Sequence, residues 1–296
     1  RKTPSKTSLA AVRARRVAAF LVLRAEGRLI FAAVLLLAAL PAAVYWGWQH
    51  VGPRVLASAD YQLEAAQIEL VPPPESIPWI RCDLKREALS MAGLDGPLLI
   101  ADDDLVGRIS QAFKLQPWVA QVDRVTKSYP ARVVVELTYR RPVAIAMVAE
   151  DNWWPVDADG FVLPQKDFPA NEANRIYPKI VGLTSGPPRP EGERWGDERV
   201  VAAARIAAAF GSAWKDEFKL SYITPLSAGG AESEDFVYEL GTDGGTRIVW
   251  GRSIDAPGEA PAAEKIARIR EHVRQHGPLD QWDRGTVLDL GTTPAL

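Results

Sequence analysis

Residues Leu29 to Trp48 read LIFAAVLLLAALPAAVYWGW and contain no charged side chain over 20 positions. As a helix that rises about 1.5 Å per residue, this stretch would be about 30 Å long, which is the hydrocarbon thickness of a bilayer. Tyr45, Trp46 and Trp48 gather at one end, as aromatic side chains do at a membrane interface. The stretch therefore predicts one transmembrane helix over residues 29–48, and proline such as Pro41 is tolerated in such helices.

The segment before this helix, residues 1–28, is strongly basic. It holds eight basic residues against one acid, Glu26, which gives +7, and the whole-chain charge of −2 leaves −9 for the remainder. An excess of Lys and Arg beside a span indicates its cytoplasmic flank. We expect a cytoplasmic tail over 1–28, a linker over 49–60 and an extracytoplasmic remainder, so that the chain is a single-pass protein of the inner (plasma) membrane. The basic residues are Arg1, Lys2, Lys6, Arg13, Arg15, Arg16, Arg24 and Arg28.

Two other interpretations of the apolar stretch stay open, a buried core helix and a cleaved signal peptide. A core helix seldom stays free of charge for this length beside a basic tail. Ala57-Ser58-Ala59 has the small-x-small pattern of a cleavage site. The apolar run nevertheless exceeds the roughly 7 to 15 residues usual for a signal peptide, which favours an uncleaved anchor.

Residues 61–142 predict a small α+β unit with the order strand, helix, helix, strand, strand. A strand over Tyr61–Leu70 precedes the loop Val71–Pro78, because proline denies the ladder its donors. Strands are also expected over Val119–Ser128 and, with clear alternation, over Val133–Tyr139. Such a unit buries two helices against one face of a three-stranded sheet, and we expect it to end near Arg141-Pro142.

The two helices of this unit have recognisable caps and apolar faces. The first is predicted from Leu84, Ala88 and Met91 at i, i+4 and i+7, with Asp83 as N-cap and Gly93 beyond the end. The second follows three aspartates that are expected to cap it, since adjacent carboxylates point in different directions and suit a metal poorly. The residues concerned are Asp102, Asp103 and Asp104, then Leu105, Val106, Ile109, Ala112 and Phe113 on one face.

Residues 143–296 predict a mixed, β-rich domain with flanking helices. Asp243-Gly244 between two apolar runs is a strong hairpin signal, and the second helix carries a Glu264 to Arg268 pair and an inward row with Ile266 and Ile269. The expected elements are a strand over Val143–Val148, a turn over Asp157–Gly160, a helix over Asp197–Phe210, hairpin strands over Phe236–Leu240 and Thr246–Trp250, a helix over Ala262–Gln275 and a last strand over Thr286–Leu290. The fold class is α+β.

Two fragments of catalytic motifs occur in this region without their partners. Ser212 and Lys215 match the SxxK of penicillin-binding enzymes, but the SxN and KTG elements that those enzymes need are missing. His272 and His276 are one helical turn apart, but the glutamate that follows the first histidine of a metalloprotease motif is missing. We interpret the first as a chance match and the second as a solvated helix face.

A third fragment, Asp157 and Asp159 before Gly160, begins like a calcium loop. No glutamate stands at its twelfth position, so a simple turn is the better interpretation. The acidic remainder of the chain argues against nucleic acid, and the single cysteine, Cys82, excludes an intramolecular disulfide. We expect recognition without catalysis, with no cofactor, metal or small-molecule substrate.

Taken in order, several short stretches resemble the FtsQ/DivIB family of cell division proteins. The most specific run is Pro117-Trp118-Val119, then Tyr129-Pro130, then Arg140-Arg141-Pro142-Val143-Ala144; Val156–Val162 and Tyr177–Gly182 are similar to the family's D-x-x-G turn and P-x-x-x-G segment. The matched positions are Pro117, Trp118, Pro130, Arg141, Pro142, Asp157, Gly160, Pro178, Gly182 and Lys265. The chain departs from the family at Gly291, where arginine is common, and in the proline-rich Val71–Pro78.

The resemblance implies a POTRA domain over 61–142 and a family-type β domain over 143–296. It also implies a non-catalytic scaffold at the division septum, which binds FtsB-like (DivIC-like) and FtsL-like partners outside the membrane and controls septal wall synthesis. Together with the exposed edge expected of a terminal strand, it places partner binding at Tyr238, Trp250, Thr286, Val287, Leu288, Asp289 and Leu290. The alternatives are a POTRA-bearing envelope assembly or secretion component and, third, a cell-wall enzyme.

Overall fold

The computed structural model describes residues 7–169, 175–188, 191–227 and 235–291, and the side chains of residues 7–28, 30 and 31 are not described. The basic residues Arg1, Lys2 and Lys6 of the predicted tail therefore lie outside the described residues. The chain divides into two compact units, Arg1–Gln62 and Leu63–Leu296. The second unit is called the body below.

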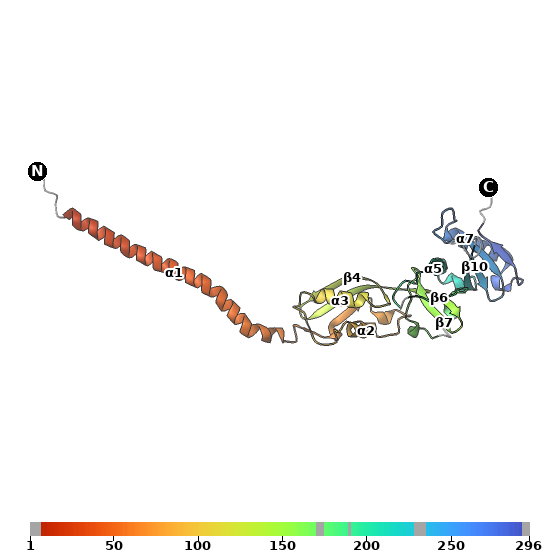
Figure 1. Cartoon of the computed structure of the whole chain (residues 1–296), viewed down its shortest axis with the longest axis horizontal. Helices are drawn as coiled ribbons and strands as arrows, with labels where there is room; N and C mark the ends of the chain where they lie inside the picture. The colour runs from red at the N-terminus through yellow and green to blue at the C-terminus, as the bar shows by residue number, and fades with distance from the viewer. Residues whose placement is uncertain (1–6, 170–174, 189–190, 228–234, 292–296) are drawn as a thin grey trace. The chain divides into compact units, whose positions relative to one another are not determined.

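The first unit is dominated by one long helix, α1 (Thr7–Leu56), shown in red to orange in Figure 1. Its part Ala32–Leu56 is long and apolar enough to span a membrane. Large apolar side chains there are exposed, with Leu37 at 79%, which is unfavourable in water. The first part of the expected linker over 49–60 is helical, because the helix continues through Pro53 to Leu56. Pro53 removes only its own donor, and its carbonyl still accepts from Ala57 N at 3.0 Å.

The body contains a three-stranded sheet in the order β2-β5-β4, built from β2 (Ile68–Val71), β5 (Arg132–Tyr139) and β4 (Val119–Ser128). Strand β2 runs parallel to β5, and β4 runs antiparallel to it. The helices α2 (Leu84–Met91) and α3 (Leu105–Lys114) lie between β2 and β4 in sequence, as predicted, but the short strand β3 (Leu98–Leu99), which was not predicted, lies between the two helices. Val133, Val135 and Leu137 are buried as the alternation predicted.

The first predicted strand, Tyr61–Leu70, is wrong as a continuous strand. It is divided into β1 (Gln62–Leu63), which pairs with β3 (Leu98–Leu99), a 3-10 turn η1 (Ala65–Gln67), and β2. The turn has a local cause, because the Gln67 side chain accepts a hydrogen bond of 2.7 Å from Glu64 N. A second 3-10 turn, η2 (Pro74–Ser76), lies in the predicted proline-rich loop.

The helix caps agree with the sequence in part. Asp83 accepts from Arg86 N at 3.1 Å, and Gly93 adopts φ +64° just beyond α2, as expected. Met91 is 71% exposed, however, and Leu89 occupies the buried face in its place. The predicted capping of α3 is also incomplete, because Asp102 accepts from Asp104 N at 2.9 Å and Asp104 makes no side-chain cap.

The second sheet of the body has seven strands in the order β12-β11-β10-β9-β8-β6-β7. Three pairs of neighbouring strands are antiparallel: β6–β7, β9–β10 and β10–β11. The other three pairs are parallel: β6–β8, β8–β9 and β11–β12. The strands are β6 (Pro142–Ala149), β7 (Asn152–Asp157), β8 (Lys179–Ile180), β9 (Leu220–Ser227), β10 (Phe236–Thr242), β11 (Arg247–Gly251) and β12 (Val287–Asp289). The hairpin β10–β11 is confirmed, whereas β7, β8 and β9 are additional to the prediction.

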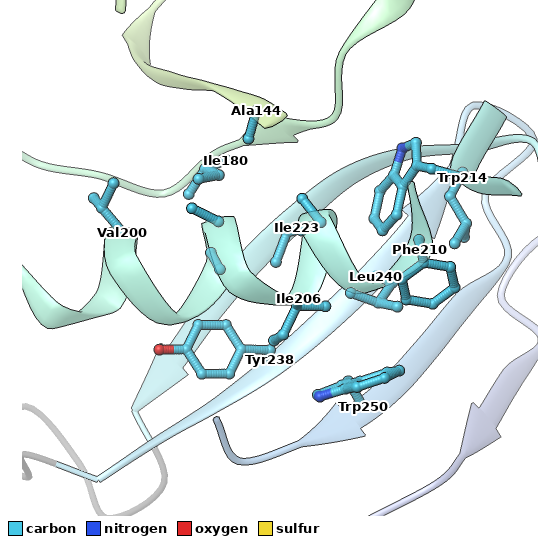
Figure 2. Close-up of a cluster of buried hydrophobic side chains, with 14 of the residues drawn as sticks. Ala144, Ile180, Val200, Ile206, Phe210, Trp214, Ile223, Tyr238, Leu240 and Trp250 are labelled. Carbon is cyan, nitrogen blue, oxygen red and sulfur yellow. The ribbon is translucent and has the colours of Figure 1, made fainter. Parts of the chain in front are cut away.

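The helices α5 (Glu198–Phe210), α6 (Ala213–Asp216) and α7 (Ala262–His276) accompany this sheet, with 3-10 turns η3 (Gln165–Asp167) and η4 (Leu279–Gln281). Helix α5 buries one side in the core, and Figure 2 shows its Ile206 and Phe210 beside Leu240 and Trp250. The Phe210 ring lies 5.5 Å from that of Trp250, centroid to centroid. Aromatic packing of this kind contributes about 1 kcal/mol per pair beyond buried area.

Candidate functional site

Strand β12 is one edge of the seven-stranded sheet, and its outer side presents unpaired backbone groups. On the inner side, Arg247 N donates to Thr286 O at 2.9 Å and Leu290 N donates to Val249 O at 2.9 Å. In a parallel ladder alternate residues bond to the same neighbour, so the amides and carbonyls of Val287 and Asp289 point away from β11. Within the described residues no further strand pairs with them.

The side chains of β12 alternate as a half-buried strand requires. Leu288 packs against the core and Leu290 is 3% exposed, whereas Val287 is 49% exposed and Asp289 faces solvent. Asp289 Oδ1 accepts from Gly291 N at 2.8 Å, a bond that turns the chain at the end of the strand. The edge is thus short, apolar on its inner face and open along its backbone.

Several hydrogen bonds hold β12 in place from the loop before it. Thr246 Oγ1 donates to Leu279 O at 2.7 Å, and Gly285 N donates to Gly245 O at 3.2 Å. Thr286 N donates to Asp283 O at 3.0 Å. The amide of Thr286 is therefore used within the turn, and among the five predicted edge residues only Val287 and Asp289 offer outward amides.

Tyr238 and Trp250, predicted to lie on the docking surface, are instead core residues. They are 3% and 0% exposed, and Figure 2 shows both rings inside the cluster around α5. Burial raises the pKa of the Tyr238 phenol, which agrees with its position away from water. Their placement at a partner surface is wrong, because strand alternation directs these two side chains to the inner face of the sheet.

The other sheet edges are blunted. At β7, Leu163 N donates to Pro155 O at 2.8 Å and Val162 forms a bridge with Val156, so the chain covers that edge. At β2, Lys85 Nζ donates to Ile68 O at 3.1 Å. Strand β4 is irregular at two places and carries charged residues such as Lys127, which are devices that oppose strand pairing. Among these edges β12 is the best suited to accept another strand.

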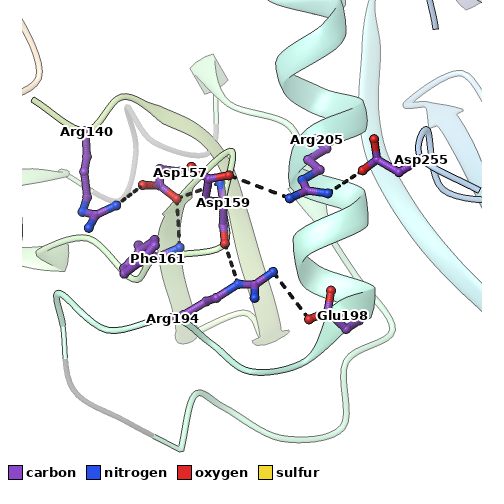
Figure 3. Close-up of polar contacts among 8 residues, drawn as sticks. All are labelled: Arg140, Asp157, Asp159, Phe161, Arg194, Glu198, Arg205 and Asp255. Carbon is purple, nitrogen blue, oxygen red and sulfur yellow. Dashed lines mark hydrogen bonds and ion pairs between the residues drawn. The ribbon is translucent and has the colours of Figure 1, made fainter. Parts of the chain in front are cut away.

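The D-x-x-G stretch forms the turn that the sequence predicted. Asp157 Oδ1 accepts from Asp159 N at 3.0 Å and from Phe161 N at 2.9 Å, while Gly160 takes φ +78°. Asp157 Oδ2 pairs with Arg140 Nη1 at 2.8 Å, and both side chains are largely buried (Figure 3). The Arg140 guanidinium also lies 3.5 Å from the centroid of the Phe161 ring.

This turn is joined to helix α5 by a surface ion network (Figure 3). Arg194 Nε donates to Asp159 O at 3.0 Å and pairs with Glu198 at 3.5 Å, while Arg205 lies 3.9 Å from Asp159 and also pairs with Asp255. Sequence reasoning missed this network, because its members are distant along the chain. Exposed pairs of this kind stabilise a fold by about 0 to 1 kcal/mol each.

The remaining family-type positions have structural roles. Trp118 Nε1 donates to Asp167 Oδ2 at 2.6 Å, and Pro117 packs against Gly192. Lys265 is fully buried and bonds to Glu259 and to Trp250 O. Pro142 begins β6, and Pro130 lies in the turn between β4 and β5. The carbonyl of Pro178 accepts a hydrogen bond from Ile145 N at 2.8 Å, and Gly182 takes φ +79°. Arg141, in contrast, is exposed.

In the described part of the chain, the residues of the two catalytic fragments do not come together in a catalytic or metal site. Ser212 precedes α6, and Lys215 is bonded to it only through the backbone, from Lys215 N to Ser212 O at 3.2 Å. Burial lowers the pKa of Lys215. The His272 and His276 rings stack at 5.9 Å, and over the described ranges no group of three potential metal ligands converges.

The structure defines a mixed α+β protein with one apolar N-terminal helix and a β-rich body, whose larger sheet has β12 at one edge with no further strand beside it among the described residues. In comparisons with known proteins, no family model matches the chain and no curated protein matches it significantly.

Proposed function

We propose that this chain is a non-catalytic, single-pass division protein of the FtsQ/DivIB type. In this proposal it is anchored by α1 in the inner membrane at the division septum and binds FtsB-like and FtsL-like partners outside the membrane. Through these partners it controls septal wall synthesis. The observation that carries the proposal is the open backbone edge of β12 on a body that follows a membrane-type helix.

The positive charge of the segment before Ala32–Leu56 supports the proposed membrane orientation. The helix part Ala32–Leu56 follows a segment with eight basic residues, and positive flanks stay in the cytoplasm. The body would then lie outside. Reporter fusions test this orientation: a phosphatase reporter after Leu296 should be active, and an inactive phosphatase would contradict it.

The order of elements around the first sheet supports a POTRA assignment. The succession β2, α2, α3, β4 and β5 follows the order that the resemblance implies, with the two-residue strand β3 additional between the helices. The family-type positions Asp157 and Gly160 also form the expected turn at the start of the second part. Both features support the same family without depending on the partner site.

The open edge supports partner binding by strand addition. Strand addition derives affinity from main-chain hydrogen bonds and specificity from alternate side chains. A partner strand beside β12 would bond to the outward groups of Val287 and Asp289 and continue the seven-stranded sheet. The exposed Val287 side chain would contact the partner from the solvent face.

The sharpest test compares Val287→Pro with Val287→Ala. Proline removes one outward amide, so binding to the extracytoplasmic segment of an FtsB-like partner should weaken by about 1 kcal/mol or more, roughly fivefold. Alanine keeps that amide and should weaken binding by less. Both full-length variants must melt as the wild type does in detergent. A folded Val287→Pro protein that binds with wild-type affinity would show that β12 is not the site.

Localisation separates this proposal from its alternatives. In dividing cells that depend on the chain, a fluorescent fusion should gather at midcell, whereas an envelope assembly component should stay dispersed. Wall-synthetic activity of the purified chain would favour the enzyme class, and Ser212→Ala would then abolish it.

A further inference from the structure

A second surface of the body, separate from β12, forms an apolar groove. Its lining includes residues 139–143, where β5 leads into β6, and its volume is about 520 Å³. An adjoining hollow of about 230 Å³ shares three of its residues, Trp79, Ile176 and Tyr177. The larger volume alone is typical of a ligand site, for which about 300 to 1,000 Å³ is usual.

The walls of this groove are aromatic and aliphatic. Trp79, Tyr139 and Tyr177 are half-buried, so each residue keeps part of its surface in contact with solvent. Ile176 is 50% exposed, which is uncommon for isoleucine. Together these side chains offer apolar surface that a ligand side chain could cover.

The polar groups along the groove are mostly satisfied within the body. Trp79 Nε1 donates to Arg140 O at 2.9 Å, and the Tyr139 hydroxyl donates to Pro72 O at 2.8 Å. Asp157 is held by Arg140 and by its own turn. Few hydrogen-bonding groups therefore remain for a ligand rich in hydroxyls, such as a glycan.

Besides the buried Nε of Arg140, which has no hydrogen-bond partner among the described residues, Arg141 is an exception among these polar groups. It is exposed, and its guanidinium lies 5.9 Å from the centroid of the Trp79 ring. It makes no ion pair with any residue that the structure describes, whereas its neighbour Arg140 is paired with Asp157. A guanidinium with several available donors beside an apolar wall favours a carboxylate next to an apolar side chain.

We infer that this groove is a second docking surface, which binds an extended segment of a partner protein. One aliphatic or aromatic side chain of that segment packs against Trp79 and Tyr177, and a carboxylate two residues away pairs with Arg141. The spacing fits, because side chains at i and i+2 of an extended chain lie about 7 Å apart on one side. The inference does not depend on the family or on the β12 proposal.

Matched peptides test this docking surface in the full chain in detergent. The probe is Ac-Ala-Phe-Ala-Glu-Ala-NH2, and its controls replace the glutamate by glutamine or the phenylalanine by serine. Binding is followed by the indole N–H resonance of Trp79, assigned from a Trp79→Phe variant. We expect saturable binding with Kd of about 1 mM, weakened about threefold or more by glutamine and abolished by serine.

Two arginine variants separate the local effect of Arg141 from general charge. Arg141→Gln should remove the preference for glutamate over glutamine, whereas Arg124→Gln on strand β4 should leave it unchanged. If Arg141→Gln does not fold, Arg141→Lys replaces it and should reduce the preference. The inference is overturned if the Trp79 resonance is unmoved at about 10 mM peptide, if both peptides bind equally, or if chitotriose saturates the groove and the peptide does not.

Discussion

The indole Nε1 of Trp118 donates a 2.6 Å hydrogen bond to Oδ2 of Asp167, and both side chains are buried. Trp118 directly precedes β4 of the three-stranded sheet, whereas Asp167 ends η3 in the segment between β7 and β8 of the larger sheet. The Trp118 ring also lies 5.8 Å from the ring of Phe168, centroid to centroid. This contact therefore joins the two sheets of the body.

Replacing Asp167 tests this contact. Asp167→Ala leaves the buried indole donor without an acceptor, so the free energy of unfolding should fall by about 1 to 3 kcal/mol. Asp167→Asn keeps an oxygen acceptor and should lose less. Urea denaturation of the full chain in detergent measures both values, and equal losses would show that packing, not the hydrogen bond, matters here.

The buried pair of Lys265 and Glu259 should be costly to break. Their side chains are 1% and 7% exposed, so Lys265→Met leaves Glu259 in the interior with Arg252, 3.6 Å away, as its remaining ion-pair partner. We expect a loss in the free energy of unfolding at or below the roughly 3 to 5 kcal/mol that breaking a buried pair costs, because Arg252 still compensates part of the charge. Adding Glu259→Leu should recover part of this loss, because the incompletely compensated carboxylate is then removed. Thermal and urea unfolding give the comparison, which fails if the double variant is less stable than Lys265→Met.

Gly160 should tolerate alanine worse than Gly93. Both have positive φ, +78° and +64°, so each substitution carries a backbone cost of about 1 to 2 kcal/mol. A Cβ at Gly160 would also lie 2.7 Å from Val201 Cγ2, whereas one at Gly93 meets nothing within 4 Å. Gly160→Ala should therefore lower the unfolding midpoint further than Gly93→Ala. Because Val201 is itself buried, the test of the clash is that the double variant Gly160→Ala with Val201→Ala loses less stability than the sum of the two single losses.

The Cys82 thiol should react slowly in the folded protein. Burial, with the carboxylates of Asp167 and Glu87, raises its pKa from 9.0 to about 12. Since the thiolate is the nucleophile, alkylation by iodoacetamide at about pH 8 should be slower than in the unfolded chain by on the order of 100- to 1,000-fold; the smaller factor allows for the higher nucleophilicity of a thiolate with a raised pKa. Equal rates in the folded and unfolded protein would contradict the burial of this thiol.

The same raised pKa fixes the sign of a stability change with pH. The unfolded chain loses the thiol proton near its ordinary value of 9.0, whereas the folded chain keeps it up to about 12. The contribution of Cys82 is therefore full below pH 9 and is lost as the pH rises toward about 12. Cys82→Ala should reduce the alkaline loss of stability, and urea midpoints between these pH values measure it.

The sequence alone determined the elements whose signals are local. The apolar run after a basic segment predicts a helix over residues 29–48, which is part of α1, although α1 continues beyond Trp48 to Leu56. Asp83 and Gly93 set the limits of α2, the alternation around Val135 predicts β5, and Asp243-Gly244 predicts the β10–β11 hairpin. Each of these depends on residues close in the chain, where capping, periodicity and turn chemistry act.

Only the tertiary structure decided which elements pair and which surfaces stay open. Strand β8 has two residues, too few for a pattern, and is held by parallel neighbours on both sides. Strand β9 contains Pro225, which argues against a strand in sequence. The proline is accommodated because β8 pairs with β9 only at Tyr222 and Ile223, so at Pro225 the strand is paired on one side only, with β10. On its other side no ladder needs the amide that proline lacks.

The open edge and the buried aromatic residues show the same distinction. A terminal strand is an expected edge, but that β12 runs parallel to β11, and so turns the amides of Val287 and Asp289 outward, follows from long-range pairing. Tyr238 and Trp250 were predicted at the partner-binding surface but are core residues, because the side of a strand that becomes buried depends on which helix covers it. The approach of Arg141 to Trp79, far apart in the chain, likewise arises only when the strands and helices pack.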